Sequence, residues 1–276
     1  MGVSPFTFQL ATRIEFGEGY LTRAGAEAKK LGITKAMVIA DKGIIACGIV
    51  KPIEESLKAE HVDYVIYDQI VPNPRDVHCI AGAEFAKEHQ VDGMIAIGGG
   101  SSMDTAKAVG TLLANGGNIR TWAAPALLEN PIIPLIAVPT TAGTGSEVTF
   151  DAVITDTEAH EKLNILDLKI APKVALVDPN VLQGLPEKVM ASTGVDALIH
   201  ALEAYTCKAA SPVTDAFALY AIDLIGANIR EAVYQRTKDS CAAMMLGSTM
   251  AGVAFGYSDV AAIHCIAEAL GGRYDT

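Results

Sequence analysis

The chain has 276 residues, of which 50% are hydrophobic and 19% are charged, and its formal net charge at pH 7 is −11. This length and hydrophobic content allow a large buried core and exclude a disordered protein. The acidic balance argues against nucleic acid or an anionic membrane as a partner, so we expect a small-molecule substrate.

Cysteine usage and the N-terminal stretch bear on the compartment. The five cysteines include no C-x-x-C pair, which argues against a disulfide framework or a zinc knuckle and favours a reducing environment. The first residues lack the basic start and the continuous apolar run of a signal peptide. We therefore expect a cytoplasmic protein.

The first half of the chain alternates between strand and helix patterns. Residues 36–40, 64–67 and 93–97 are short apolar runs that are typical of buried parallel strands. Helical periodicity in residues 44–60 and 76–90 separates them. This order predicts an α/β domain with a parallel sheet, which binds ligands at the carboxyl ends of its strands.

A glycine-rich turn follows the third of these strands. It consists of Gly98, Gly99, Gly100, Ser101 and Ser102, and residues 103–115 after it have a helical pattern. Glycines at this position let backbone N–H groups approach an anion, and the helix start adds the positive end of its dipole. The turn has the features of a phosphate cradle, although it matches no standard nucleotide motif; a purely structural tight turn is the alternative.

A second polar loop follows the strand predicted at 134–138. Its residues Thr140, Thr141 and Thr144 offer small donors of the kind that a ribose or a pyrophosphate requires, although an ordinary polar loop has the same composition. Further strands are predicted at 152–155, in a hairpin or at an edge, and at 174–177.

The pattern changes near residue 185. Beyond it we predict helices only, at 187–191, 193–207, 212–235, 242–255 and 260–270. We therefore divide the chain into an α/β domain at 1–185 and a helical domain at 186–276, with the site in the cleft between them. The uncharged run 240–258 contains a G-x-x-x-G spacing, but acidic residues flank it, and we interpret it as a buried helix and not a membrane span.

Two same-face pairs of ionisable residues stand out in the helical part. Asp196 and His200 are four residues apart, which is a metal-ligand spacing on a helix. The alternative is that Thr193 starts the helix in a capping box with Asp196, which leaves His200 as a core histidine. His264 and Glu268 form the second pair, and burying both among apolar residues is costly unless they are paired or bound to a ligand.

Three motifs together resemble the iron-containing (group III) alcohol dehydrogenases: GGGSSMDTAK at 98–107, PTTAGTGSEVT at 139–149 and STGVDALIHALEAY at 192–205. The resemblance covers nearly the whole chain. It implies a Rossmann-like dinucleotide-binding domain followed by a helical domain, which is the dehydroquinate synthase-like architecture, and a homo-oligomer. It also implies hydride transfer between NAD(H) and a small primary alcohol or aldehyde, with the substrate oxygen on Fe2+ or Zn2+.

The resemblance assigns roles to particular residues. It makes Asp196, His200 and His264 the metal ligands and places the pyrophosphate on residues 98–102. Asp41 would face the adenine ribose, where a carboxylate repels a 2′-phosphate and favours NAD(H) over NADP(H). The remaining positions that it places along the dinucleotide are Asn73, Thr140, Thr141, Thr144 and Lys162.

The sequence departs from the family pattern at two points. Glu268 stands where family members commonly carry a second histidine, so we predict that Glu268 is the catalytic acid or base, or an additional oxygen ligand. The resemblance also implies a Pro-His-Gly segment with a fourth ligand beyond Thr276. We therefore expect an incomplete helical domain that holds three of four protein ligands.

Three alternative functions remain open. A hydroxyacid-oxoacid transhydrogenase would reuse bound nicotinamide without releasing it. A dehydroquinate synthase-like lyase would need several basic residues near the metal, whereas the nearest in sequence to His200 is Lys208. The third alternative is a chain that binds a dinucleotide without catalysis.

Overall fold

The computed structural model describes residues 5–274, so residues 1–4 and 275–276 of the two predicted domains lie outside the described part. Within it, a parallel sheet has the strand order β1-β8-β5-β4-β2-β3, and β6 pairs with β7 in an antiparallel hairpin. The strands are β1 (Arg13–Phe16), β2 (Lys35–Ala40), β3 (Asp63–Tyr67), β4 (Gly93–Gly98), β5 (Leu135–Pro139), β6 (Asp151–Asp156), β7 (Glu161–Leu166) and β8 (Val174–Val177).

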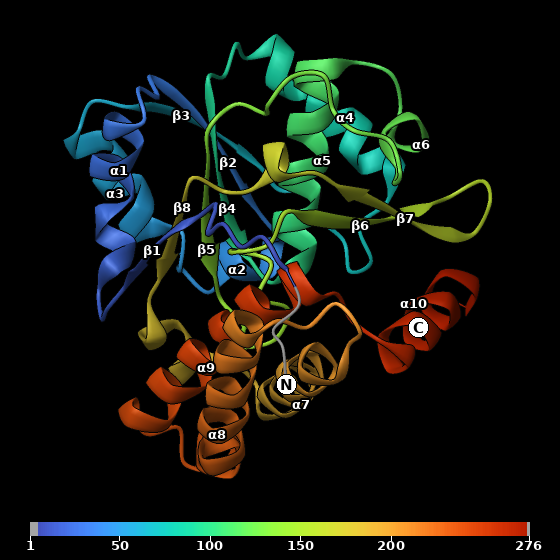
Figure 1. Cartoon of the computed structure of the whole chain (residues 1–276). Coiled ribbons are helices and arrows are strands. Elements are labelled where there is room, and N and C mark those ends of the chain that lie inside the picture. Colours follow the sequence, from blue (N-terminus) through green and yellow to red (C-terminus); the bar gives the residue numbers. More distant parts are fainter. Residues whose placement is uncertain (1–4, 275–276) are drawn as a thin grey trace.

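Helices surround the sheet and follow it in sequence (Figure 1). The helices are α1 (Ala24–Lys30), α2 (Lys42–Ala46), α3 (Lys51–Ala59), α4 (Asp76–Glu88), α5 (Gly100–Asn115), α6 (Ile119–Trp122), α7 (Glu187–Thr206), α8 (Pro212–Tyr234), α9 (Lys238–Ser258) and α10 (Ala262–Tyr274). Short 3-10 helices span Tyr20–Arg23, Leu168–Ile170 and Pro179–Gly184. The prediction of an α/β part followed by a helical part is confirmed.

The central strands are apolar because both faces of the sheet are covered. Val38 and Ile95 point into the core under α1 and α3, whereas Met37 and Met94 on the same strands point into the core under α4 and α5. All residues of β4 and β5 are buried. Strands that are buried on both faces read as continuous apolar runs, which is why the sequence located them.

Two local predictions were wrong, and strand β1 was not predicted. Residues 44–60 form two helices instead of one, because Gly48 adopts a left-handed conformation with φ of 77° between them. Strand β1 was missed because its sequence, RIEF, is short and half charged, and its pairing with β8 is long-range. The helices predicted separately at 187–191 and 193–207 form one continuous helix, α7. Within it the hydroxyl of Thr193 donates to the carbonyl of Val189 (2.9 Å). Thr193 therefore lies inside α7 and is not the N-cap of a helix.

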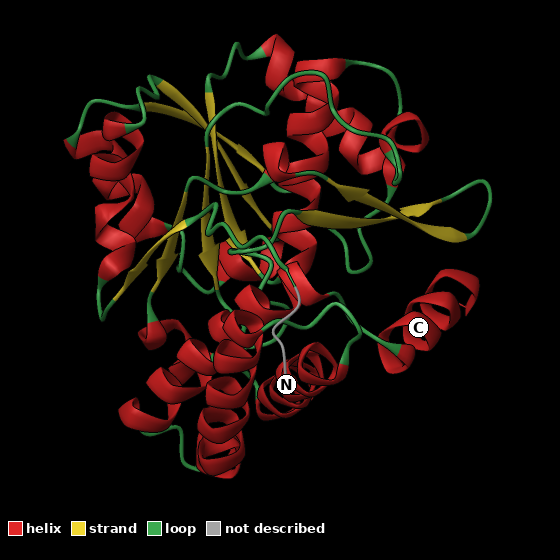
Figure 2. Ribbon diagram, viewed as in Figure 1, coloured by secondary structure: helices red, strands yellow, loops and turns green. Residues whose placement is uncertain are grey.

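Helices α7, α8 and α9 pack below the carboxyl ends of the sheet strands, and α10 turns away from α9 to lie under the β6–β7 hairpin, with its start bonded to α7 (Figure 2). A methyl group at Gly272 of α10 would lie 3.2 Å from the backbone nitrogen of Lys162, so this helix approaches β7 closely. The loop after β5 joins the two parts, because a methyl group at Gly145 would lie 2.5 Å from the Cα of Gly252 in α9. The domain boundary at residue 185 stays a prediction.

Among residues 5–274, no single helix is long and apolar enough to cross a membrane. Helices α9 and α10 taken together pass a test of length and composition, but they are bent by 94° at their junction. In the structure Gly252 of the G-x-x-x-G spacing contacts the loop after β5, which gives this glycine a packing role.

Candidate dinucleotide and metal site

The glycine-rich turn lies at a switch point of the sheet. From β2 the chain first adds β3 on one side and then crosses to add β4 on the other side of β2. Ligands of open α/β sheets bind at such a point, beyond the carboxyl ends of the strands. Asp41 follows β2 and Gly98 ends β4, so the structure places both at this crevice.

The loops after β4 and β5 pack tightly against each other. Gly98 has a φ of 149°, and the backbone nitrogen of Thr140 donates to its carbonyl oxygen (2.9 Å). A methyl group at Gly100 would lie 2.9 Å from Cγ2 of Thr144, and one at Gly99 would lie 3.2 Å from Oγ1 of Thr141. The structure therefore brings together the two loops that the sequence singled out, and leaves no room there for larger residues.

Asp41, Asn73 and Lys162, which the sequence also singled out, lie on other elements. Asp41 caps α2, since its Oδ1 accepts from the backbone nitrogens of Gly43 (2.7 Å) and Ile44 (3.0 Å). The Nζ of Lys162 in β7 donates to Oδ1 of Asn73 (3.1 Å). Asn73 has a left-handed φ of 54° in the turn before α4.

A buried polar cluster lies under the loop after β5. The Nζ of Lys107 donates to Ser146 O (2.8 Å), Ser146 Oγ (2.9 Å), Thr149 Oγ1 (3.1 Å) and Asp151 O (2.8 Å). Asp104 accepts from Ser146 Oγ (2.8 Å) and from the backbone nitrogen of Val153 (3.1 Å). Burial lowers the pKa of Lys107 and raises the pKa of Asp104 to about 6. We did not predict this cluster, although a lysine within the helix after the glycine turn was a signal.

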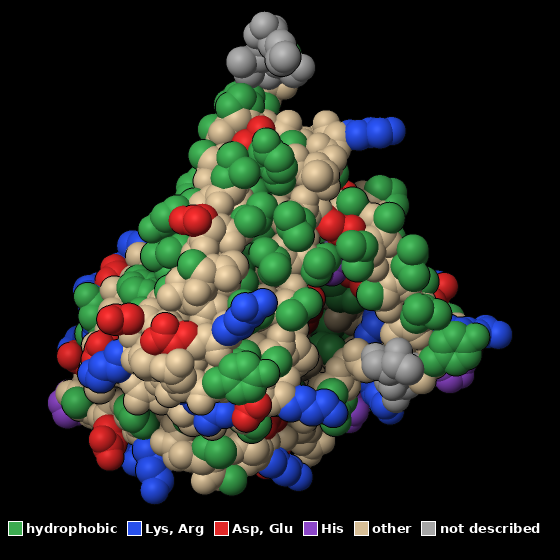
Figure 3. Space-filling model, turned by 90° about the horizontal axis from the view of Figure 1, so that it is seen from below, with side chains coloured by type: hydrophobic (Ala, Val, Ile, Leu, Met, Phe, Trp, Pro, Cys, Tyr) green, Lys and Arg blue, Asp and Glu red, His purple; other side chains and the backbone are tan. Residues whose placement is uncertain are grey.

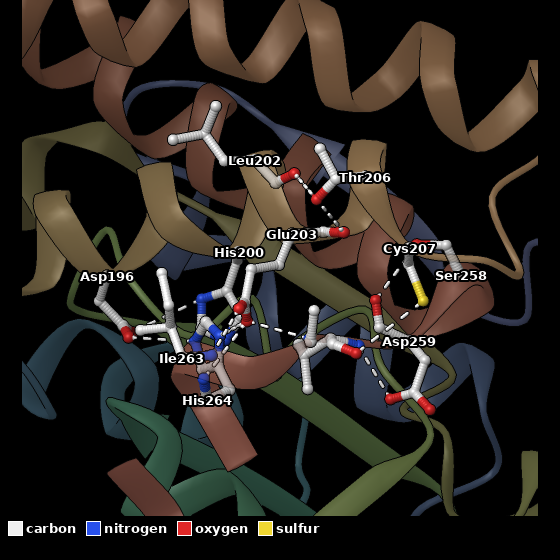
Figure 4. A network of polar contacts seen from close by, with 12 residues as sticks. Asp196, His200, Leu202, Glu203, Thr206, Cys207, Ser258, Asp259, Ile263 and His264 are labelled. Atoms are coloured by element: carbon white, nitrogen blue, oxygen red, sulfur yellow. Dashed lines mark hydrogen bonds and ion pairs between the residues drawn. The ribbon is translucent and has the colours of Figure 1, made fainter. Parts of the chain in front are cut away.

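Asp196, His200 and His264 converge from two helices, and each offers a ligand atom within 4.8 Å of the others (Figure 4). Asp196 Oδ2 lies 3.7 Å from His200 Nδ1, and Asp196 Oδ1 lies 3.6 Å from His264 Nε2. The two imidazoles stack with centroids 4.0 Å apart. Residues far apart in sequence thus form one compact group of donors.

The environment of His200 favours a neutral, electron-donating ring. Its other face stacks on Phe255 at 4.4 Å, and its buried Nδ1 has no hydrogen-bond partner within the described part of the chain. Burial lowers the pKa of His200 to about 4, against the opposing charge of Asp196. An orphaned buried nitrogen beside a carboxylate is the arrangement expected where a cation is the missing partner.

His264 has a second partner, Glu203, that sequence reasoning missed. Its Nδ1 lies 2.6 Å from Oε2 of Glu203 on α7. Burial opposes protonation of His264, but hydrogen bonds to Asp196 and Glu203 outweigh it and raise its pKa. Burial also opposes ionisation of Glu203, but the bonds from His264 and three backbone N–H groups lower its pKa to about 2. The signal was available, because Glu203 follows His200 by three residues on the same helix.

Glu268 lies one turn after His264 on α10. The residue is exposed as a whole, but partial desolvation of its carboxylate and the nearby charge of Asp151 raise its pKa. His264 and Lys162 oppose this shift. Glu268 is therefore close enough to His264 and to the β6–β7 hairpin for their charges to influence its carboxylate.

The donor set fits a first-row divalent cation, since two imidazoles and one carboxylate suit both Fe2+ and Zn2+ and leave room for further ligands. Seen from below, the surface is hollowed beside the α10 end of the molecule, with charged side chains around the hollow (Figure 3). The side chain of Asp196 is 38% exposed, so the group is in contact with solvent on that side.

Known proteins provide an independent comparison. The family model "Iron-containing alcohol dehydrogenase" matches residues 11–179, and "Fe-containing alcohol dehydrogenase family, C-terminal" matches residues 190–276. The NAD-dependent methanol dehydrogenase of Bacillus methanolicus is 39% identical over 94% of this chain and 68% of its own length. The choline dehydrogenase of Bacillus subtilis is 40% identical over 96% of this chain and 67% of its own length.

A solved structure agrees with this relationship. The alcohol dehydrogenase from Oenococcus oeni superposes with a TM-score of 0.94 at 36% identity, covering 99% of this chain and 72% of that chain. The present chain thus spans about two thirds of the length of the curated relatives. The chain belongs to the iron-containing alcohol dehydrogenase family.

Proposed function

We propose that this chain binds NAD(H) and a divalent metal ion, Fe2+ or Zn2+, and acts as an alcohol dehydrogenase or aldehyde reductase. The observation that carries the proposal is the convergence of Asp196, His200 and His264 from α7 and α10. The family membership and the name of the NAD-dependent methanol dehydrogenase support the same activity.

The cofactor would occupy the crevice at the switch point. Backbone N–H groups of residues 98–102 at the start of α5 would hold the pyrophosphate. Thr140, Thr141 and Thr144 would contact the dinucleotide from the opposing loop, and Asn73 and Lys162 from the hairpin side. The carboxylate of Asp41 would bind the ribose hydroxyls through Oδ2, which accepts no hydrogen bond from residues 5–274, and this favours NAD(H) over NADP(H).

The reaction requires little from the protein beyond positioning. When bound, the metal supplies a Lewis acid and the nicotinamide supplies a hydride acceptor or donor. His200, His264 and Asp196 would hold the metal, and the stacked ring of Phe255 keeps His200 in place. Glu268, with its raised pKa, would exchange the proton of the alcohol. The substrate is then a small alcohol or aldehyde that enters the cleft.

The test is NADH oxidation by the purified chain with short-chain aldehydes, after anaerobic loading with Fe2+ or Zn2+, with and without a chelator. We expect turnover that disappears with the chelator and in His200→Asn. The matched control is His61→Asn, since His61 is exposed just before β3, at the amino end of that strand. Chelator-resistant turnover, or full activity of His200→Asn, would contradict the metal role.

Ligand binding is measured separately from turnover. Quenching of protein fluorescence by NADH reports the dinucleotide site, and competition with a chromophoric chelator reports the metal site. We expect His200→Asn to lose metal binding and to keep NADH binding. Loss of both in a folded variant would argue against two independent sites.

A further inference from the structure

Four nitrogen atoms lie within hydrogen-bond distance of the carboxylate of Glu203. Oε2 lies 2.6 Å from Nδ1 of His264 and accepts from the backbone nitrogens of Ala261 (3.0 Å) and His264 (3.3 Å). Oε1 accepts from the backbone nitrogen of Ile263 (2.7 Å). Glu203 is 5% exposed, and Figure 4 shows it between α7 and the start of α10.

Three of these bonds fasten α10 to α7. The first N–H groups of a helix have no partner within the helix, and an anion at that end also complements the helix dipole. In α10 the anion comes from another helix, because the chain turns sharply at Asp259, which has a φ of 73°. The position of α10, and of His264 on its first turn, therefore depends on Glu203.

The fourth bond fixes the proton on the imidazole of His264. The Glu203 carboxylate accepts from three backbone N–H groups and, when ionised, has no hydrogen to donate, so the hydrogen between Oε2 and Nδ1 of His264 belongs to Nδ1. In the neutral ring the lone pair then lies on Nε2, which is the nitrogen 3.6 Å from Oδ1 of Asp196. Nε2 is thus the only ring nitrogen of His264 that can bind a cation in this arrangement.

We infer that Glu203 is a positioning residue for the metal site: it selects the Nδ1–H tautomer of His264 and holds the start of α10 so that Nε2 points at Asp196 and His200. Glu203 is not itself a ligand. Carboxylates that accept from a metal-binding histidine orient the ring and increase its basicity. The inference rests on the proposed metal site for its effect on metal affinity, whereas the tautomer can be measured without metal.

The variant that tests the inference is Glu203→Gln. With its amide oxygen in the place of Oε1 it can still accept from the backbone nitrogen of Ile263, and its NH2 group in the place of Oε2 loses the two other backbone bonds but can donate to Nδ1 of His264 and so place the hydrogen on Nε2. In metal-free protein, at a pH above the raised pKa of His264 so that its ring is neutral, 15N chemical shifts of the histidine rings report the tautomer directly, with the His264 signals assigned by their loss in His264→Ala. We expect Nδ1–H in the parent chain and Nε2–H in Glu203→Gln.

Metal affinity is the second readout. We expect Zn2+ binding by Glu203→Gln to weaken by about 10- to 100-fold in chelator competition, which is the usual effect of losing such a partner. The absorption spectrum of the Co2+ form should change as well. Glu203→Asp keeps an anionic acceptor and should preserve the Nδ1–H tautomer.

Ser211→Ala is the matched control, because Ser211 caps α8 through the backbone nitrogen of Thr214 (3.2 Å) without contacting His264. It should lower the melting temperature and leave the tautomer and the metal affinity unchanged. The inference is wrong if the parent chain has Nε2–H on His264, a measurement that requires no variant to fold. It is also wrong if Glu203→Gln keeps the parent tautomer and affinity. If the parent chain shows Nδ1–H but binds no metal, the proposed function fails and the tautomer assignment stands.

Discussion

Lys107 and Asp104 lie near each other on α5, and both bind the hydroxyl of Ser146: Lys107 donates to it at 2.9 Å, and it donates to Asp104 at 2.8 Å. Lys107 is completely buried, and its hydrogen-bond acceptors all belong to residues 146–151, which end at the first residue of β6. Lys107 and Asp104 thus hold the loop after β5, which contains Thr140, Thr141 and Thr144, against α5, which begins in the glycine-rich turn.

Replacing Lys107 should therefore be strongly destabilising. Lys107→Met leaves the buried carbonyl oxygens of Ser146 and Asp151 without this donor and removes the positive charge that stabilises the Asp104 carboxylate, and leaving a buried charge uncompensated costs about 3–5 kcal/mol. Urea unfolding followed by circular dichroism measures the change. The double variant Lys107→Met/Asp104→Leu should recover part of the loss. A loss below about 1 kcal/mol in the single variant would show that the cluster contributes little.

The glycine turn should be sensitive to a single methyl group. In Gly100→Ala the new methyl would lie 2.9 Å from Cγ2 of Thr144, so one of the two loops must move away from the crevice. We expect NADH binding, measured by fluorescence titration, to weaken by about tenfold or more, equivalent to at least roughly 1.4 kcal/mol. The control is Gly226→Ala in α8, where a methyl group meets nothing within 4 Å. It should leave NADH affinity unchanged and raise stability slightly.

Asp41 should set the preference for the dinucleotide. We choose Asp41→Ser because serine can still cap α2, whereas its hydroxyl does not repel a 2′-phosphate. The ratio of the dissociation constants for NADPH and NADH should fall by about tenfold, since juxtaposed like charges cost on the order of a kcal/mol or more. An unchanged ratio would remove Asp41 from the ribose site.

The metal-free chain should lose stability in mild acid because of His200. Its pKa is about 4 in the folded chain and 6.5 ordinarily, so between these values the unfolded chain binds a proton that the folded chain does not. Stability due to this residue is therefore complete above pH 6.5 and is lost as the pH falls towards 4, by up to roughly 3 kcal/mol.

Comparing the parent chain with His200→Asn isolates this effect, because Asp104, whose raised pKa has the opposite influence, is present in both. Urea unfolding at a series of pH values should show a shallower dependence for the variant in this range. Parallel curves for the two proteins would mean that His200 is not kept neutral by burial.

Local patterns predicted most of the sheet, and they singled out the three residues that the structure brings together, Asp196, His200 and His264. The strands β2, β4 and β5 are buried on both faces and therefore read as unbroken apolar runs, and the glycine turn is recognisable because it separates such a strand from a helix. The edge strand β1 carries Arg13 and Glu15 and gives no such signal. The single helix α7 was divided because Thr193 has the composition of a cap, and only the continuous backbone shows otherwise.

By itself, the sequence determined which residue types are available and how far apart they stand along one helix: Asp196 and His200 share a face because four residues make about one turn. It could not determine what His264 faces, since the path from α9 to α10 depends on the backbone at Asp259 and on the bonds from Glu203. Only the tertiary structure brings His264 to Asp196, His200 and Glu203, because this depends on contacts between helices whose spacing no local pattern records.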